Sequence, residues 1–424
     1  MAQIAASNLG TAALTNRKLK YFAAAVLDAM PYIRLSRSYF KDDVKNKKAG
    51  MVYRFYVPDP GIAIVGTDDL DITNDNKDIW ELPVDIKLVE GRTDVALNAW
   101  HKLTAIEDFT RDIAEPHGRS LGAEIEKTII EDNWFRADSA IVDNSGNPST
   151  KIFSLLAARL RGIRSQGTKV GFAHPDVFAA LGDALIGKFL PSDIMKKIFG
   201  DTVIAHAFGS EWIEENYMPF ITTPDTLPTV ANVSVNWNTG EVTESGTSHL
   251  FDGYAFTCSA TANDGKTFKT VDLNGKITNE DFVFIVKKAD DGKFYIQLSG
   301  EQIRFAEDGS GKKLSNPTIG AVPGAINNTS GVMTGITVAT VANMAASTTY
   351  AIIQVRDRDA LEFDTYEFDE VAGAKNDKIK AAEITVQTAE QGSITTRNSI
   401  MRVDVPYMAK LVLTKLARVA YVKV

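Results

Sequence analysis

The sequence predicts an α+β fold in which a mixed region of helices and strands is interrupted by an all-β domain. Apolar residues at helical spacing predict one long helix over about 104–132. From Thr223 the apolar spacing changes to two and stays so until about residue 345, which predicts short strands without helices. The mixed pattern then resumes, and residues 419–424 form an apolar segment typical of a strand.

Length and composition are those of an ordinary globular protein. The 424 residues suggest about two to four domains, and a hydrophobic content of 44% argues against general disorder. A single cysteine, Cys258, excludes a disulfide framework and a cysteine-based zinc site. We find no signal region and no run of about 18 apolar residues, so we expect a soluble protein made in a cytoplasm that contacts no membrane.

Charge is unevenly distributed along the first ninety or so residues. The net charge of −8 argues against tight, charge-driven DNA binding by the whole molecule. The first fifty-odd residues are nevertheless basic, and the segment after them is acidic. Charge runs are more often solvated surface stretches, but neighbouring segments of opposite sign also suit contacts between copies of one chain. The residues that we predict to make such assembly contacts are Arg17, Lys20, Arg34, Arg37, Asp68, Asp69, Asp71, Asp75 and Trp80.

The N-terminal part predicts a helix and then a long hairpin. The helix covers about residues 16–30 and ends at Pro31. Strand 51–66, an acidic loop at 67–79 and a return strand at 80–88 form the hairpin, with one apolar face on the return strand. Because an isolated hairpin is only marginally stable, we expect this one to lie against something else, such as a neighbouring subunit.

The long helix opens at Thr104, which forms a capping box with Glu107. Pro116 lies within it and should kink the helix or split it in two. The apolar stripe of the helix consists of Ile106, Phe109, Ile113, Leu121, Ile125 and Ile129.

A mixed α/β block follows, and its helices and strands alternate. The predicted helices are 150–166 (ended by Gly167), 175–181 and 192–199, and the predicted strands are 169–173, 203–208 and 219–222. The all-β stretch then predicts about six strands in a small barrel or sandwich, with hairpin turns at Asn238-Thr239-Gly240, Asn263-Asp264-Gly265, Asn274-Gly275 and Asp290-Asp291-Gly292. Val230 and Trp237 belong to its first alternating strand, and residues 309–335 form a long surface loop. The strands after it are 350–355, 361–368, 384–388, 400–405 and 419–424.

Two stretches approximate ligand-binding motifs. Gly182 to Lys188 has phosphate-loop spacing, but Phe189 replaces the hydroxyl residue that would hold magnesium, so a chance match is far more common. Asp69, Asp71 and Asp75 approximate a calcium loop but lack its glycine and its final glutamate. A solvated acidic tip with at most weak divalent binding is the better interpretation.

Single residues give no catalytic, cofactor or metal site. His174 precedes Pro175 and Asp176 and could act as a general base, but a structural histidine at a helix N-terminus is the commoner case. Cys258 lies in an apolar strand and is interpreted as a small buried hydrophobe. The other histidines lack a ligand-spaced partner, and the five tryptophans are interpreted as core or interface anchors.

Four local stretches, in this order, carry a resemblance to a known family. They are residues 108–133, 207–223, 282–298 and 392–405. In this order the chain resembles the major capsid protein of tailed bacteriophages, the Hong Kong ninety-seven type fold. More narrowly, it is similar to the P-twenty-two type coat proteins, which insert a β-barrel into their axial domain.

The resemblance implies a division of the chain into named parts. These are an N-terminal arm (1–45), an extended hairpin and the start of the peripheral domain (46–98), a spine helix (99–135), a first axial part (136–223), the inserted β-domain (224–345), the axial return (346–392) and C-terminal strands of the peripheral domain (393–424).

The resemblance also implies a function and partners. It implies pentamers and hexamers that close an icosahedral shell around double-stranded DNA, with a scaffolding protein, a portal protein and an auxiliary or decoration protein as partners. The chain would then reside in the virion capsid, and in the host cytoplasm before assembly. Two alternatives stay open: a tail or baseplate protein that binds through its β-domain, and an enzyme centred on His174.

Overall fold

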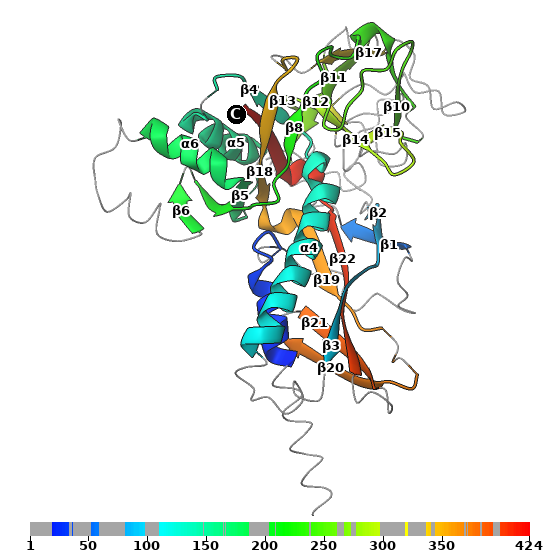
Figure 1. Ribbon diagram of the computed structural model, residues 1–424. Helices are drawn as coiled ribbons and strands as arrows, with labels where there is room; N and C mark the ends of the chain where they lie inside the picture. Colours follow the sequence, from blue (N-terminus) through cyan, green and yellow to red (C-terminus); the bar gives the residue numbers. More distant parts are fainter. Residues whose placement is uncertain are drawn as a thin grey trace, which may run out of the picture. The chain divides into compact units, whose positions relative to one another are not determined.

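The computed structural model describes the greater part of the chain. The described residues are 19–33, 36, 52–58, 81–97, 110–146, 148–163, 165, 167–185, 203–207, 209–236, 239–260, 267–272, 277–296, 319–320, 336–340, 344–368, 370, 372–381, 384–392 and 399–424. They form an α+β fold with several separate sheets, which confirms the predicted class (Figure 1). None of the described helices is long and apolar enough to cross a membrane.

The chain divides into two compact units. The first unit comprises Met1–Phe55, Asp85–Ile130 and Leu361–Lys410, and the second comprises Tyr56–Val84, Glu131–Ala360 and Leu411–Val424.

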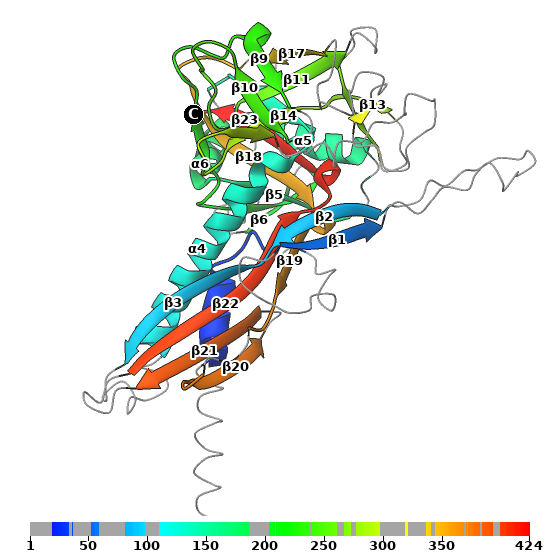
Figure 2. The same cartoon turned by 90° about the vertical axis from the view of Figure 1, so that its right-hand side faces the viewer.

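A five-stranded sheet forms the frame of the first unit. Its strands are β3 (Val89–Leu97), β19 (Leu361–Thr365), β20 (Lys375–Ala381), β21 (Ile384–Gly392) and β22 (Ser399–Leu411). The long strand β22 pairs antiparallel with β3 along one edge and with β21 along the other, and β20 follows β21 (Figure 2). Val403 and Val405 of β22 are fully buried, so they form part of the core of this unit.

The long helix is present but starts irregularly. A π-helical turn, Thr110–Ala114, leads into α4 (Glu115–Asn133), so Pro116 lies in the first turn of the regular helix. The π turn changes the hydrogen-bond register where proline cannot donate, which explains why Pro116 neither ends nor splits the helix. Ile113, Leu121, Ile125 and Ile129 of the predicted stripe are buried, whereas the predicted capping box lies outside the described residues.

Residues 19–28 form the predicted N-terminal helix, which packs tightly on α4. A Cβ added at Gly122 would lie 2.4 Å from the Val26 carbonyl oxygen, and one added at Gly118 would lie 2.8 Å from the Ala25 Cβ. Since these two glycines are four residues apart, they share one face of α4 and let the neighbouring backbone approach. The Tyr32 amide donates a hydrogen bond to the buried Glu126 carboxylate nearby in the same unit.

The predicted hairpin is present as strands β1 (Val52–Pro58) and β2 (Glu81–Lys87), which pair with each other and with no other described strand. Ile86 and Leu88 are buried, as the alternation predicts, while Val52 is 59% exposed. β2 continues after Leu88 into β3, so the return strand is longer than the sequence predicts.

A seven-stranded mixed sheet organises the second unit. Its order is β4 (Ala140–Asp143), β23 (Ala417–Lys423), β18 (Thr349–Asp357), β5 (Lys169–Ala173), β7 (Ser210–Glu214) and β6 (Val203–Ala207), with β8 (Phe220–Thr222) also paired to β18. Helices α5 (Thr150–Gly162) and α6 (Pro175–Leu185) belong to this unit. Phe153 of α5, Phe178 of α6 and Trp212 of β7 pack their rings together; the centroids of Phe153 and Trp212 are 4.6 Å apart.

Two differences from the predicted elements of this unit have physical reasons. Helix α5 ends at Gly162 rather than near Gly167; the Ser165 amide bonds to the Leu160 carbonyl, five residues back, which departs from the four-residue spacing of an α-helix. The resemblance groups residues 393–424 together as C-terminal strands, whereas β23 pairs with β18 and β4 of the seven-stranded sheet and β22 belongs to the five-stranded one. Periodicity identifies a strand and not its pairing partner, so the sequence pattern could not show which sheet β23 joins.

The all-β stretch forms two further sheets, and we call its strands β9 to β17 the β-region. One sheet has the order β17 (Ile336–Thr340), β11 (Ala255–Ala260), β14 (Phe284–Lys288), β15 (Phe294–Ile296), β10 (Glu241–Glu244) and β9 (Val233–Val235). The other has the order β13 (Ile277–Asp281), β12 (Lys269–Val271) and β16 (Ile319–Gly320). The sequence places Val230 in the first strand, but this residue begins a short 3₁₀ turn, Val230–Asn232.

Short turns complete the described backbone. Further 3₁₀ turns cover Trp134–Arg136, Arg358–Ala360 and Thr414–Leu416. Gly240 and Gly292 have φ of 76° and 82°, so the predicted turns at 238–240 and 290–292 use glycine in the left-handed region. The predicted turns at 263–265 and 274–275, Trp237, and the helix at 192–199 lie outside the described residues.

Candidate functional site

His174 lies between strand β5 and helix α6, where the sequence places it. Its Nδ1 accepts a hydrogen bond of 3.2 Å from the Asp176 amide, so the imidazole caps the first turn of α6. Its ring stands edge-on to Phe220, with 4.6 Å between the ring centroids. These contacts give His174 a structural role at a helix N-terminus and place no nucleophile beside it.

Cys258 is fully buried in strand β11 of the β-region. Burial strongly raises the pKa of its thiol, because the thiolate would be poorly solvated there. The side chain therefore serves as a small apolar core group, as the sequence predicts.

Neither the phosphate-loop spacing at 182–188 nor the acidic stretch at 67–79 corresponds to a binding site among the described residues. Gly182 lies inside helix α6, whereas the first glycine of a phosphate loop must precede its helix. Gly187, Lys188 and the acidic tip at 67–79 lie outside the described residues. Among the residues that the structure describes, no three acidic, histidine or cysteine side chains form a metal-holding group.

One predicted assembly residue, Lys20, is described: it is exposed on the helix formed by residues 19–28. The other predicted contact residues lie outside the described residues, namely Arg17, Arg34, Arg37, Asp68, Asp69, Asp71, Asp75 and Trp80.

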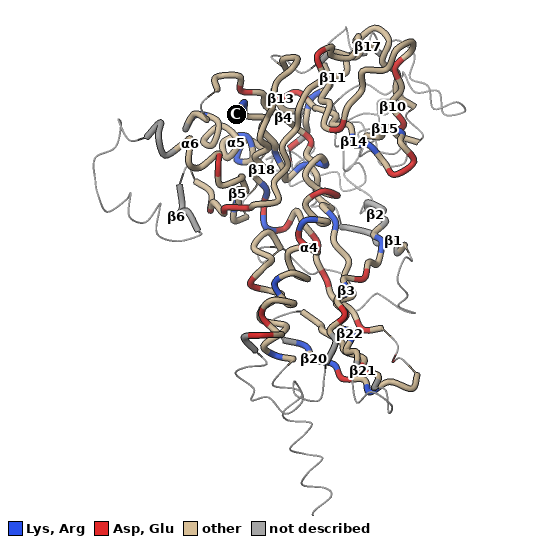
Figure 3. Tube along the Cα trace, viewed as in Figure 1, with Lys and Arg blue, Asp and Glu red and all other residues tan. Residues whose placement is uncertain are grey.

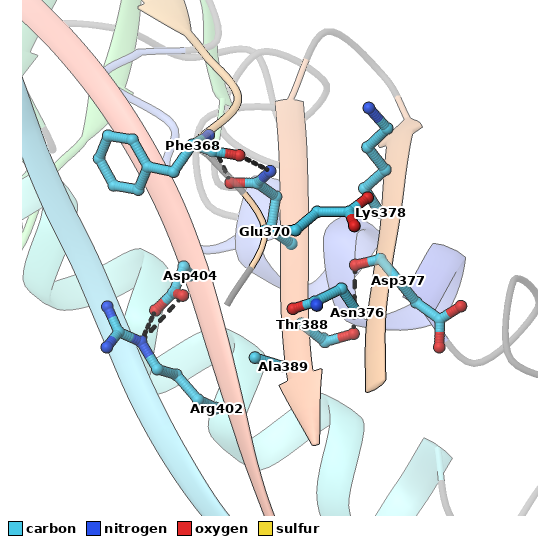
Figure 4. Close-up of a pocket in the computed structure, with 10 residues that line it drawn as sticks. Phe368, Glu370, Asn376, Asp377, Lys378, Thr388, Ala389, Arg402 and Asp404 are labelled. Carbon is cyan, nitrogen blue, oxygen red and sulfur yellow. Dashed lines mark hydrogen bonds and ion pairs between the residues drawn. The ribbon is translucent and has the colours of Figure 1, made fainter. Parts of the chain in front are cut away.

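A shallow polar depression lies on the five-stranded sheet of the first unit (Figure 4). Its volume is about 120 Å³, well below the roughly 300–1,000 Å³ of typical small-molecule sites. It is lined by Phe368, Glu370, Asn376, Asp377, Lys378, Gln387, Thr388, Ala389, Arg402 and Asp404. Strands β20, β21 and β22 supply most of these residues, side by side in register.

The charges around this depression are paired with one another. The Arg402 Nε lies 2.7 Å from Asp404 Oδ1, and the same guanidinium also reaches the Glu90 carboxylate on β3. Lys378 Nζ lies 2.7 Å from Glu367 Oε2. Burial raises the pKa of the Asp404 carboxyl, and the hydrogen bond from Arg402 opposes that rise.

This arrangement suits a protein surface better than a substrate site. Both cations of the depression already bind carboxylates, and Gln387 exchanges two hydrogen bonds with the Phe368 backbone, at 2.8 Å and 3.0 Å. Figure 3 shows basic and acidic residues intermixed along β20 to β22. The result is a mixed-charge sheet face whose described cations, Arg402 and Lys378, are both ion-paired.

The sequence did not single out Arg402, Asp404 or Lys378. The available signal is the alternation in β22, where Arg402 and Asp404 occupy one face and Val403 and Val405 the other. Alternation identifies the outer face of a strand, but it does not tell which outer faces become neighbours.

Comparison with known proteins gives structural likenesses only. No protein-family model matches the sequence, and no curated protein sequence matches it. The structure is similar to a chain of the capsid of Ralstonia phage GP4, with a TM-score of 0.42 and 7% identity, over 88% of this chain and 84% of that chain.

Two further solved structures are similar over nearly the whole chain. The head structure of Helicobacter pylori bacteriophage KHP40 gives a TM-score of 0.40 at 8% identity, over 93% of this chain and 90% of that chain. The mature capsid of bacteriophage PhiM1 gives 0.36 at 10% identity, over 91% of this chain and 87% of that chain. At these values the likeness concerns the fold alone, and function is argued below from the chain's own residues.

Proposed function

We propose that this chain is the major capsid (coat) protein of a tailed bacteriophage, which assembles as pentamers and hexamers into an icosahedral shell enclosing double-stranded DNA. The observation that carries the proposal is the two-stranded ribbon β1–β2, which runs on into β3 and pairs with no other described strand. It is combined with the order of parts expected of a coat protein: N-terminal helix, ribbon, long helix, mixed sheet, β-region and closing strands.

The ribbon supports assembly because two strands on their own have low stability. Two strands alone are marginally stable in water and become stable when a third strand or a packed surface covers them. Val52 at the start of β1 is 59% exposed, which leaves apolar surface on the ribbon of a single copy. A neighbouring copy would supply the missing cover, so the ribbon is suited to overlap the next subunit of a shell.

The side-chain chemistry supports a structural rather than a catalytic role. His174 caps a helix, Cys258 is buried with a raised thiol pKa, and the cations of the sheet depression are ion-paired. We therefore propose that no residue of this chain is catalytic and that its product is the assembled shell.

The partners follow from the same proposal. A scaffolding protein would guide assembly, a portal protein would occupy one vertex, and an auxiliary or decoration protein could bind the finished shell. Contact with packaged DNA would be non-specific, since the chain carries a net charge of −8 and its first fifty-odd residues are a basic segment. Before assembly the chain would reside in the host cytoplasm.

The test is to co-express the chain with the scaffolding protein of its phage and to examine the product by electron microscopy. We expect closed shells of uniform size. Deletion of residues 1–18 is the sharper arm variant, because deletion of 1–40 would also remove the helix that packs on α4. We expect the 1–18 deletion to keep the native circular dichroism spectrum and to abolish shells.

Three results would contradict the proposal in different ways. Normal shells from the 1–18 deletion would remove the arm from the assembly mechanism. A stable monomer that never forms particles, with or without scaffold, would refute the coat-protein assignment. Tubes or spikes would favour the tail or baseplate alternative.

A further inference from the structure

A buried ion cluster joins the β-region to the seven-stranded sheet within the second unit. Glu280 lies on β13 of the β-region, and its carboxylate accepts hydrogen bonds from Arg418 of β23. The Arg418 Nε is 3.1 Å from both carboxylate oxygens, and its second terminal nitrogen is 3.0 Å from Oε2. The Arg418 side chain is fully buried and that of Glu280 is 10% exposed, so water screens this pair little.

A second arginine shares the same carboxylate. Arg159 of helix α5 lies 3.0 Å from Glu280 Oε1 and also donates a hydrogen bond of 3.0 Å to the Ser139 hydroxyl. Arg418 uses its remaining terminal nitrogen to bond the Lys415 and Ala417 carbonyls, each at 2.8 Å. Glu280 is thus a single acidic group from the β-region that is held by two cations, one on α5 and one on β23. We call the seven-stranded sheet with helices α5 and α6 the α/β part.

Two neutral contacts lie on the same boundary. The Val283 amide, two residues after β13, donates to the Asp138 carbonyl at 3.0 Å. The Tyr421 hydroxyl of β23 donates to the Gly253 carbonyl at 2.9 Å, and Gly253 has a φ of 86° with Ile221 Cδ1 only 2.3 Å from where a Cβ would stand. The β-region therefore contacts the seven-stranded sheet and its neighbouring segments through β13, the residue before β14 and the segment before β11.

The two covalent connections alone do not fix the position of the β-region on the seven-stranded sheet. The chain passes into the β-region after β8 and returns into β18, and these two strands pair with each other at Thr222 and Thr349. The Thr223 amide bonds the Thr348 carbonyl, and the Ser347 hydroxyl bonds Asp225. These contacts join the two segments that enter and leave the β-region at one place. They would still allow the β-region to rotate about that place, so its orientation depends on the contacts of Glu280, Val283 and Gly253.

We propose that Glu280 is the positioning residue that fixes the β-region on the seven-stranded sheet, and that neutralising this one carboxylate releases the β-region while both sheets stay folded. The physical reason is asymmetry: removing one member of a buried charge cluster leaves the other charges without compensation. Two buried or half-buried arginines facing a neutral amide would draw water into the boundary. This inference concerns one copy of the chain and does not depend on the proposed function.

The experiment is residue-resolved hydrogen exchange on the full-length, unassembled chain and on Glu280→Gln. The Val283 amide is the reporter, because its partner, the Asp138 carbonyl, lies across the boundary. We expect its exchange to become at least about tenfold faster in the variant, a change of about 1.4 kcal/mol in local opening. The Val286 amide, which bonds Tyr254 within the β-region, and the Ile352 amide, which bonds Pro219 within the α/β part, should keep their protection.

Asp281→Asn is the matched control. Asp281 is the next residue of the same strand and loses the same charge, but its carboxylate pairs with Lys269 at 2.5 Å inside the β-region. We expect this control to leave the Val283 amide at its wild-type exchange rate. An equal acceleration in both variants would show a general charge effect and would overturn the inference.

Two other outcomes also decide the matter. Unchanged Val283 protection in Glu280→Gln would overturn the inference directly. Loss of protection at Val283, Val286 and Ile352 together would make Glu280 a residue required for folding and would equally overturn it. If Glu280→Gln does not accumulate, Arg159→Gln can be used in its place, because it removes only the half-exposed partner of Glu280. Faster exchange of the Val283 amide alone supports the inference, and an unchanged exchange rate contradicts it.

Discussion

Asp138 is a carboxyl group whose pKa the fold shifts toward neutral pH. Its side chain is fully buried, and burial raises the pKa of its carboxyl to about 6, although the nearby Arg418 and Lys415 oppose the rise. Glu280 adds a further raising influence. In the folded protein this carboxyl therefore binds its proton more tightly than it does in the unfolded chain.

The pH dependence of Asp138 has a definite sign. Because the folded pKa lies above the unfolded value, its contribution to stability is fully present below about pH 4 and is lost as the pH rises through 6. A rise of about two pKa units corresponds to about 3 kcal/mol. We expect Asp138→Asn to match the wild-type free energy of unfolding at pH 4 and to exceed it by up to about 3 kcal/mol at pH 7, measured by urea unfolding.

The control for this prediction is Asp290→Asn, which removes one exposed carboxyl from the turn before β15. Its difference from the wild type should stay within about 0.5 kcal/mol at both pH values. A free-energy difference between Asp138→Asn and the wild type that does not change between pH 4 and pH 7 would contradict the raised pKa.

The residue-scale interpretations show what a sequence can and cannot tell. The structural roles of His174 and Cys258 were predictable, because each depends on its own neighbours in the chain. The clusters around Glu280 and Arg402 were not, since Arg418 lies 138 positions from Glu280 and Glu90 lies 312 positions from Arg402. Single-sequence patterns carry no information about such pairs.

At the scale of elements, the pairing of the N-terminal helix with α4 depends on two small residues. Gly118 and Gly122 cost helical stability in isolation, about 1 kcal/mol each relative to alanine. Their value lies in the close approach that they allow to Ala25 and Val26. The same helix tolerates Pro116 because the π turn before it leaves no regular amide bond for proline to break.

Gly122→Ala should destabilise the protein although alanine favours helix. Its Cβ would lie 2.4 Å from the Val26 carbonyl oxygen and 2.9 Å from the Ala29 Cβ, and the first of these is a backbone atom. We expect a loss of about 1–3 kcal/mol from overpacking, which outweighs the propensity gain. Thermal unfolding followed by circular dichroism measures it.

Ser120→Ala is the matched control, because Ser120 lies on the exposed face of α4 between the two glycines. It should leave the midpoint unchanged or raise it slightly. A Gly122→Ala variant as stable as Ser120→Ala would show that the two helices are not held in contact there.

Elements with strong periodicity were predicted and weakly patterned ones were not. Helices α4 and α5 and strand β5 follow their apolar stripes, and the hairpin of β14 and β15 follows its Asp-Gly turn. Strand β20 was missed because Lys375–Ala381 is a polar edge strand, in which lysine discourages further pairing. Strand β3 was missed because Gly91, which has no side chain to clash with Ile125, interrupts its alternation.

At the scale of the molecule, class and order of elements were predictable, but sheet membership was not. The α+β class and the switch to short strands follow from local period alone. Sheet membership depends on contacts between distant segments. Such contacts place β23 in the seven-stranded sheet, and they place β19 to β21 with β22 in the five-stranded one. The predicted boundaries of the inserted β-domain, 224 and 345, remain a proposal.

A fragment of residues 224–345 tests those boundaries. Its core is local: Phe256 and Phe284 stack with ring centroids 5.4 Å apart, and Phe282 lies 4.8 Å from Phe284. We expect the isolated fragment to give dispersed amide NMR signals and to unfold cooperatively.

Phe284→Ala supplies the comparison for that fragment. Loss of a fully buried phenylalanine costs about 3–5 kcal/mol, so the variant fragment should lose its dispersion. A wild-type fragment with collapsed signals would mean that the β-region needs the α/β part in order to fold.

The position of β23 has a consequence for synthesis. This strand lies between β4 and β18, and it pairs in register with residues 140–143, translated almost three hundred codons earlier. Until residues 417–423 have been synthesised, β4 and β18 therefore lack the strand that lies between them, and the edge strand β4 has no described neighbour in this sheet. We expect chains that lack residues 417–423 to leave β4 without its neighbour and this sheet incomplete, because pairing between such distant segments forms late.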